Sequence, residues 1–229
     1  MTTTSKRAHP WAGETAASPH LSHPEDTFAG SPHGPWVVVD AFGGQGSGPY
    51  AAQLIAAELA VDGDPSERFA AARARLATDI GPNGGGGSAV RLTITGAVAE
   101  LAWLGDCRAY RLRDNQAEQL TRDHTFVQEM IDAGHLTPEQ AAVSEHANIL
   151  MHGLMDGVDD EPELVRVDLH PGDRILLISD GVWRALDRML PPIGPTPQTA
   201  VHELLAAVVR RSTDDDATAV LVEFTPDEP

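Results

Sequence analysis

Apolar and polar residues follow two patterns along the chain, one typical of strands and one typical of helices. Short apolar runs such as WVVVD at 36–40 are typical of buried strands. After Pro49 the apolar residues recur at intervals of three and four, which predicts an amphipathic helix. The patterns predict strands at 36–40, 88–95, 98–104, 108–112, 118–120, 163–169, 174–179 and 217–224, and helices at 51–59, 65–80, 123–133 and 199–211, with another helix beginning at Thr137.

Many of the predicted strands follow one another without a helix between them. Such an order favours antiparallel sheets in a mixed α/β domain. Residues 1–22 show no periodicity and are rich in Thr, Ser, Ala, His and Pro. We therefore expect a flexible N-terminal arm at 1–22, with a first strand near its end as the alternative, and one domain at 23–229.

Composition and charge narrow the class of protein. The chain of 229 residues has 16 Lys and Arg against 34 Asp and Glu, a net charge of −18, which argues against nonspecific binding to nucleic acid or an anionic membrane. No apolar run is long enough to span a membrane. The single cysteine, Cys107, excludes an internal disulfide framework and a multi-cysteine zinc site. It also suits a reducing compartment, so we expect a cytoplasmic protein, monomeric by default.

Carboxylates stand next to the ends of the apolar runs. A carboxylate beside a buried strand is costly unless it is paired or holds a metal ion. For each position taken alone, a turn-forming aspartate is the alternative explanation. Taken together, clustered carboxylates without neighbouring bases suit a hard divalent cation bound through oxygen. The positions are Glu25, Asp26, Asp40, Asp106, Asp180, Asp214, Asp215 and Asp216.

Seven short motifs contain most of these carboxylates. They read HPEDT at 23–27, VDAFGG at 39–44, LGDCRAY at 104–110, QLTRDH at 119–124, PGDR at 171–174, SDGVW at 179–183 and DDATAV at 215–220. In kind and order the motifs resemble those of the metal-dependent protein phosphatases, the PPM family (type 2C), in its compact bacterial form. The resemblance covers nearly the whole chain, from about residue 22 to 224.

The resemblance implies both a fold and an activity. The implied fold is α/β, a β-sandwich of two mainly antiparallel sheets flanked by helices in four layers (α-β-β-α), with a flap at about 125–160. The implied activity is hydrolysis of phosphoserine and phosphothreonine in a protein substrate by a metal-activated water. It uses two Mn²⁺ or Mg²⁺ ions, with a third ion in many members.

The resemblance also implies roles for individual residues. Asp106 would hold the third ion together with Asp180, and Asp26 would orient the attacking water. The implied ligands of the first two ions are Asp40, which would bridge both, Glu25 and the backbone carbonyl of Ala41 on one ion, and Asp180 and Asp215 on the other.

Four positions depart from the family pattern, among them Phe42, which stands where other members have methionine or histidine. Leu21 stands where the family usually has an arginine that binds the substrate phosphate, so His20 or His23 would have to replace it. Ala41 stands where glycine is usual, and Asp216 stands where asparagine is usual. These departures leave two alternatives open. One is a catalytically weak or inactive pseudophosphatase that binds a phosphoprotein or a partner, and the other is a phosphatase for a small phosphorylated molecule.

Overall fold

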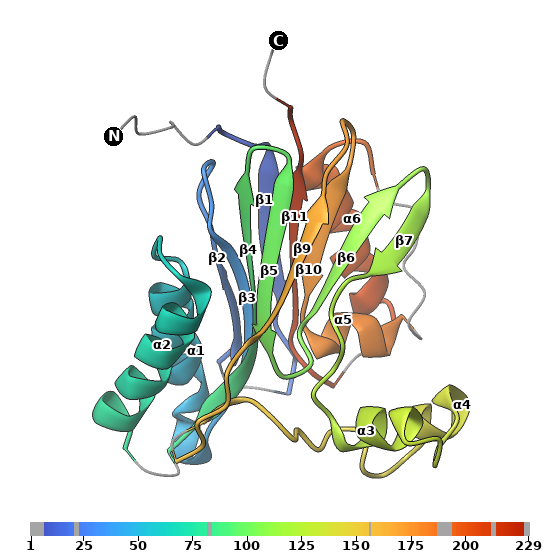
Figure 1. The fold of residues 1–229 in the computed structure, drawn as a ribbon. Helices are drawn as coiled ribbons and strands as arrows, with labels where there is room; N and C mark the ends of the chain where they lie inside the picture. The colour runs from blue at the N-terminus through green and yellow to red at the C-terminus, as the bar shows by residue number, and fades with distance from the viewer. Residues whose placement is uncertain are drawn as a thin grey trace.

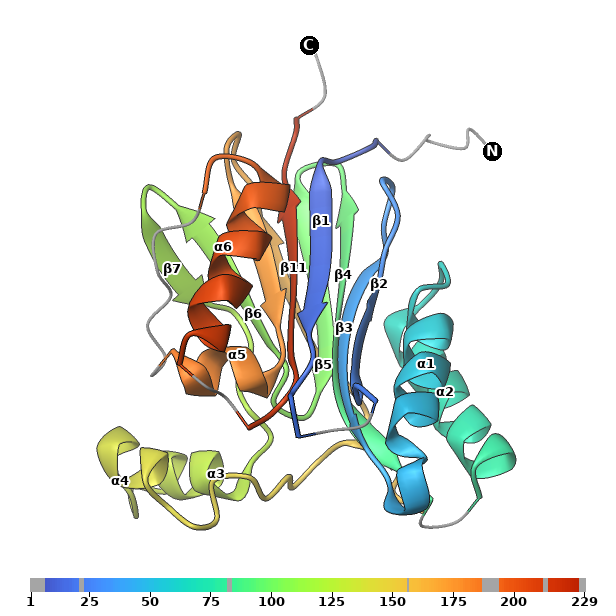
Figure 2. The same ribbon diagram turned by 180° about the vertical axis from the view of Figure 1, so that it is seen from behind.

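The chain forms two antiparallel sheets packed face to face between two layers of helices (Figures 1 and 2). The computed structural model describes residues 7–20, 23–81, 84–155, 157–186, 194–211 and 214–226. Within these ranges every pairing between strands is antiparallel. The four-layer sandwich implied by the sequence is therefore confirmed.

The first sheet has five strands in the order β1-β11-β10-β6-β7. Helices α5 (Asp180–Ala185) and α6 (Pro197–Val209) cover its outer face, as Figure 2 shows for α6. The strands are β1 (Trp11–Ala16), β11 (Ala217–Glu223), β10 (Arg174–Ile178), β6 (Arg108–Arg113) and β7 (Gln116–Gln119).

The second sheet has six strands, five of them in the order β2-β3-β4-β5-β9, with β8 paired to β4. Helices α1 (Gly48–Leu59) and α2 (Pro65–Asp79) cover its outer face, and a short 3-10 helix, η1 (Gly44–Gly46), precedes α1. The strands are β2 (Asp26–Ala29), β3 (Trp36–Phe42), β4 (Gly86–Thr95), β5 (Val98–Leu104), β9 (Glu163–Asp168) and β8 (Leu154–Met155).

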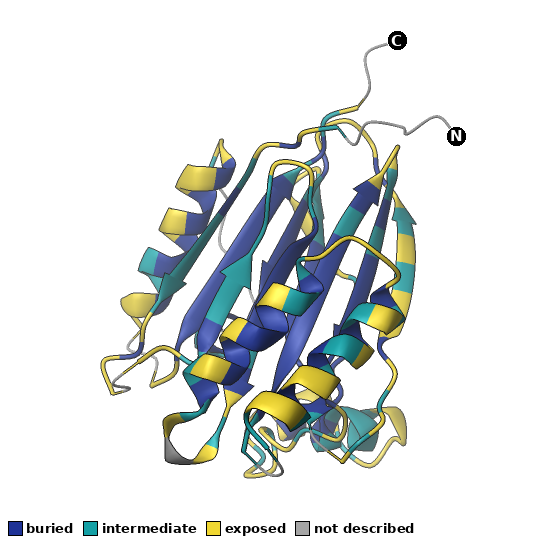
Figure 3. Cartoon of the chain, turned by 90° about the vertical axis from the view of Figure 1, so that its left-hand side faces the viewer, coloured by how far each residue is buried: buried dark blue, intermediate teal, exposed yellow. Residues whose placement is uncertain are grey.

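The uninterrupted apolar run of β3 follows from burial on both faces. Trp36 and Val38 pack between the two sheets, whereas Val37 and Val39 pack under α1 and α2. Because successive side chains of a strand point to opposite faces, a strand covered on both sides must be apolar at every position. Figure 3 shows the result: the strands are buried along most of their length, and the helices expose their outer faces.

Within the segment expected as an N-terminal arm, residues 11–16 form a strand, which agrees with the alternative of a first strand and corrects the arm there. These residues form β1, which pairs with β11 from Trp11 opposite Val222 to Ala16 opposite Ala217. Trp11 also contacts Phe28 edge-on, with ring centroids 6.5 Å apart. The segment reads as an arm because an edge strand with small and polar residues lacks the apolar run of a central strand.

The segment expected as a flap contains two short helices at one end of the sandwich. Helix α3 (Phe126–Asp132) and helix α4 (Pro138–Ala142) lie together beneath α5 in Figure 1. Each begins at a threonine whose side chain accepts an N–H of the first turn, and Thr137 forms a reciprocal capping box with Gln140. No helix within the described ranges combines the length and apolar character that a membrane crossing requires.

A buried arginine joins the second sheet to its helical layer. Arg91 of β4 is 2% exposed and donates hydrogen bonds to the carbonyls of Leu59 (2.8 Å), Val61 (3.1 Å) and Gly63 (3.3 Å). Leu59 is the last residue of α1, so the guanidinium satisfies carbonyls that have no partner within the helix. Burial lowers the pKa of Arg91 from its ordinary value, but these contacts hold the cation in place.

Replacing this arginine should destabilise the fold. Arg91→Met keeps much of the apolar stem and removes the donors, so we expect a loss of about 3 kcal/mol in the free energy of unfolding, measured in urea. The matched control is Arg75→Met, because Arg75 is exposed and binds only Glu58 and Asp79 at the surface. That control should change stability by less than about 1 kcal/mol. Equal effects in the two variants would contradict this account.

Candidate functional site

Strand ends bring four aspartates together at one end of the sandwich. Asp26 begins β2 and lies directly opposite Asp40 of β3. Asp106 follows β5, and Asp180 follows β10 as the first residue of α5. Burial raises the pKa of Asp40 well above its ordinary value, and the nearby charges of Asp180, Asp26 and Asp106 raise it further. The four carboxylates predicted from the sequence therefore act on one another directly.

The cluster carries more negative charge than its protein surroundings neutralise. Burial is the main cause that raises the pKa of Asp26, and Asp180 adds to it. Burial and then Asp180 and Asp123 raise the pKa of Asp106 to about 7, although Arg184 and Arg108 act in the opposite direction. Carboxylates this close cannot all ionise near neutral pH without an additional cation.

Asp180 has a carboxylate oxygen that accepts no hydrogen bond from the residues that the structure describes. Asp180 contacts the Nε of Arg184 through its Oδ2 at 2.8 Å. Its Oδ1 is buried and accepts no hydrogen bond in the described structure. A buried oxygen without a partner is costly, so it marks a place where a ligand would be held.

Ser179 fixes the position of Asp26. Its hydroxyl donates to Asp26 Oδ2 at 2.6 Å and accepts the backbone N–H of Thr218 at 2.9 Å. Asp26 is thereby tied to β11 as well as to β3, its strand neighbour. The sequence analysis missed this serine, because its partner lies 153 residues away in the chain.

Asp216 is a structural anchor rather than an open ligand. It is 1% exposed, and its two oxygens accept the N–H groups of Ser18 (2.7 Å) and Glu25 (2.6 Å). The carboxylate thus ties the segment between β1 and β2 to the start of β11. The negative charge that replaces the usual asparagine is used to hold backbone donors in place.

Glu25, Ala41 and Asp215 lie around the rim of the cluster. The N–H of Ala41 donates to the Glu25 carbonyl at 3.1 Å, and the Glu25 carboxylate packs against Gly48 in the first turn of α1. A side chain at Gly48 would collide with that carboxylate. Burial and then the charge of Asp180 raise the pKa of Asp215, so Asp215 lies within electrostatic reach of Asp180.

The predicted phosphate-binding position involves His20, Leu21 and His23. Leu21 lies outside the described residues. His20 is exposed and forms an ion-pair contact with Asp214 at 3.4 Å, and His23 is exposed as well. A role for His20 or His23 in substrate binding stays a prediction.

The donor set fits ions that keep part of their water shell. Among the parts of the chain that the structure describes, no three carboxylate, imidazole or thiol groups are placed together as a cage that could hold a metal ion. Mg²⁺ rarely uses such a cage, because it holds several waters and binds through one or two carboxylates. The unpartnered Asp180 oxygen and the uncompensated charge of the cluster match that mode of binding.

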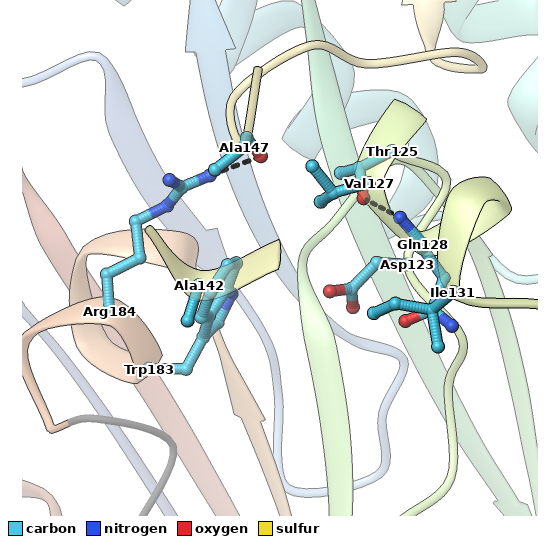
Figure 4. Close-up of a pocket in the computed structure, with 9 residues that line it drawn as sticks. All are labelled: Asp123, Thr125, Val127, Gln128, Ile131, Ala142, Ala147, Trp183 and Arg184. Atoms are coloured by element: carbon cyan, nitrogen blue, oxygen red, sulfur yellow. Dashed lines mark hydrogen bonds between the residues drawn. The ribbon is translucent and has the colours of Figure 1, made fainter. Parts of the chain in front are cut away.

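A cavity of about 270 Å³ lies between α5 and the segment that carries α3 and α4 (Figure 4). Val127 and Ile131 of α3 line one side, and Trp183 and Arg184 of α5 line the other. Arg184 also contacts Asp180 and Asp106, so the cavity adjoins the carboxylate cluster. The sequence analysis missed Arg184, although its position four residues after Asp180 is the spacing of an ion pair on a helix.

Comparison with known sequences identifies related phosphatases. The chain is 32% identical over 205 residues to the serine/threonine protein phosphatase PstP of Mycobacterium tuberculosis, a match that covers 81% of this chain and 39% of PstP. It is 35% identical over 108 residues to the protein phosphatase PhpP of Streptococcus pneumoniae, which covers 47% of this chain and 44% of PhpP. The chain thus spans less than half the length of these curated relatives. No protein-family model matches it.

Solved structures share the whole architecture. The crystal structure of the M. tuberculosis phosphatase PstP superposes with a TM-score of 0.81 at 27% identity and covers 95% of this chain and 99% of that one. A structure of the PstP catalytic domain in complex with two manganese ions gives a TM-score of 0.78 at 27% identity, with 94% and 98% covered.

Removing the charge of Asp216 should loosen the segment that carries Glu25 and Asp26. In Asp216→Asn an amide N–H₂ would face one of the backbone N–H groups that the carboxylate accepts. We expect a loss of about 2 kcal/mol in the free energy of unfolding, measured in urea. Asp159→Asn, at a side chain that is 95% exposed and forms a surface ion pair with Arg73, serves as the control and should cost less than about 1 kcal/mol. Unchanged stability of Asp216→Asn would contradict the anchoring role.

The stability of the metal-free protein should depend on the protonation of Asp106. Its pKa is about 7 in the folded protein, above its ordinary value, so the folded state holds a proton that the unfolded state releases. This contribution is full below about pH 4, the ordinary range of an aspartate, decreases as the pH rises and is lost once the pH has passed through 7. From pH 6 to pH 8, in chelator, wild type should therefore lose about 1 kcal/mol relative to Asp106→Asn.

The comparison with Asp106→Asn removes an opposing effect. Burial lowers the pKa of His124, whose contribution to stability increases with pH in both proteins. The measurement is urea unfolding of both proteins at the two pH values. Parallel pH dependence of wild type and variant would show that Asp106 is ionised throughout.

Proposed function

Because this chain belongs to the PPM (type 2C) family of metal-dependent serine/threonine phosphatases, we propose that it hydrolyses phosphoserine and phosphothreonine with the help of two divalent ions. The observation that carries the proposal is the cluster of buried aspartates that lacks enough protein cations and includes an unpartnered oxygen on Asp180. The manganese-bound catalytic domain of PstP, which has the same fold, supports two ions as the number.

The proposed ligands are those that the family resemblance implies. Asp40, central in the cluster, would bridge the two ions. Glu25 and the carbonyl of Ala41 would hold one ion, and Asp180 and Asp215 would hold the other. When bound, Mn²⁺ or Mg²⁺ would neutralise these carboxylates, stabilise charge on the phosphoryl oxygens and lower the pKa of water.

The chain's own groups would position the reactants and move the proton. Asp26, whose pKa is raised mainly by burial and whose carboxylate is held by Ser179, would orient the attacking water and accept its proton. Asp216 keeps Glu25 in place through its backbone. In-line attack on phosphorus needs no covalent intermediate on the protein, which matches a site built from carboxylates.

The remaining expectations about partners and compartment are part of the same proposal. The substrate would be a phosphorylated protein, and the net charge of −18 favours a basic partner over nucleic acid or an anionic membrane. A single buried, free cysteine suits the cytoplasm. We retain a monomer and a role in phosphorylation signalling as proposals.

Substitution of the central ligands should abolish turnover. We expect Mn²⁺-dependent hydrolysis of a phosphothreonine peptide by wild type, and a decrease of about 100-fold or more in Asp40→Asn and in Asp180→Asn, because each loses charge that holds an ion. Asp79→Asn, at an exposed position on α2, should retain wild-type activity.

The same assay separates the alternatives. Turnover of an aryl phosphate without turnover of the peptide would indicate a small-molecule substrate. No turnover of either compound by folded protein that binds Mn²⁺ would indicate a binding module and contradict the proposed activity.

A further inference from the structure

One arginine connects the carboxylate cluster to the segment at 144–149. Arg184 lies on α5, where its Nε is 2.8 Å from Asp180 Oδ2 as an ion pair without hydrogen-bond geometry, and its Nη2 is 3.4 Å from Asp106 Oδ2. Its Nη1 donates to the side chain of Asn148, and its Nη2 donates to the carbonyl of Ala147 at 3.5 Å. A single guanidinium thus spans two acidic groups of the site and two groups of the flap.

Arg184 is partly buried and packs against an aromatic side chain. The side chain is 26% exposed, and Asp106 beside it is 5% exposed. The ring of Trp183 lies 4.6 Å from the Arg184 guanidinium, and its Nε1 donates to the Asp106 carbonyl at 3.1 Å. A planar guanidinium suits this place, because it is weakly hydrated, carries several donors and can stack on an aromatic ring.

The guanidinium of Arg184 already supplies positive charge to both Asp106 and Asp180, which disfavours a metal ion at the same place. An ion that bridged the two carboxylates would have to break both contacts with Arg184 and then lie beside its positive charge. The Oδ1 of Asp180 is still available on the other side of the carboxylate. Arg184 therefore competes for Asp106, and it leaves Asp180 free to ligate through Oδ1.

We propose that Arg184 is a resident cation that replaces a metal ion between Asp106 and Asp180 and ties the flap to the site. Asp106 is then the partner of an arginine and not a metal ligand, and the chain holds two divalent ions rather than three. The proposal rests on the proposed function, because it concerns ions bound to the same carboxylates. Arg184 is a positioning residue in this scheme, since it acts through Asp106, Asp180 and the flap.

The test counts Mn²⁺ ions directly. Binding stoichiometry is measured by isothermal titration and by electron paramagnetic resonance of free Mn²⁺, on folded protein. We expect two equivalents in wild type, three in Arg184→Gln, and two in the double variant Arg184→Gln/Asp106→Asn. Arg75→Gln is the matched control, because Arg75 also binds two carboxylates, Glu58 and Asp79, but on the surface of α2, and it should bind two equivalents.

A second variant keeps the test decisive if Arg184→Gln does not fold. Asp106→Asn alone should still bind two equivalents with an affinity within about threefold of wild type, because Asp106 holds no ion. Loss of an equivalent in Asp106→Asn, three equivalents in wild type, or two in folded Arg184→Gln would each overturn the proposal. A wild type that binds no Mn²⁺ would instead contradict the proposed function.

The flap provides an independent readout. Hydrogen exchange over 144–149 should become at least about tenfold faster in Arg184→Gln, because the segment loses its contacts through Asn148 and Ala147. Exchange in Arg75→Gln should match wild type. Unchanged exchange in Arg184→Gln would overturn the tie between the flap and the site.

Discussion

Repulsion among buried carboxylates governs the arrangement of the site. Asp26, Asp40, Asp106 and Asp180 stand at or near the ends of separate strands, and burial together with the charge of Asp180 raises the pKa of the other three. Such a cluster is stable only if cations enter it or protons stay on it. Arg184 neutralises part of the negative charge. The Asp180 oxygen that accepts no hydrogen bond in the described structure can ligate an ion that neutralises more of it.

The surrounding polar groups make that cluster rigid. Ser179 holds Asp26, and Asp216 holds the backbone of Glu25, so two elements at the C-terminal end of the chain position two acidic residues near its N-terminal end. Each contact is a charge-assisted hydrogen bond in a buried place, where it is stronger than at the surface. Side chains that would otherwise move apart are therefore held at a fixed separation.

The sequence predicted the parts of this structure that depend on local pattern. The apolar run at 36–40 and the carboxylate that ends it appear as β3 and Asp40, because burial on both faces leaves a periodic signature. The contacts of Asp216 with Ser18 and Glu25 span 198 and 191 residues, and no local pattern encodes such pairs. Helix α5 is only six residues long, too short to show a period, so Arg184 was not recognised as a neighbour of Asp180.

The pairing of β1 with β11 has a consequence for how the molecule is made. The contact joins Trp11 to Val222 across nearly the whole chain, and the same strand carries Thr218 beside the anchor Asp216. A growing polypeptide on the ribosome cannot form these pairs until β11 has emerged. The acidic residues that precede β3 therefore wait, without their final partners, until residues 153 and 191 positions further along the chain have been added. Assembly of the carboxylate cluster coincides with the pairing of β1 and β11 in the first sheet.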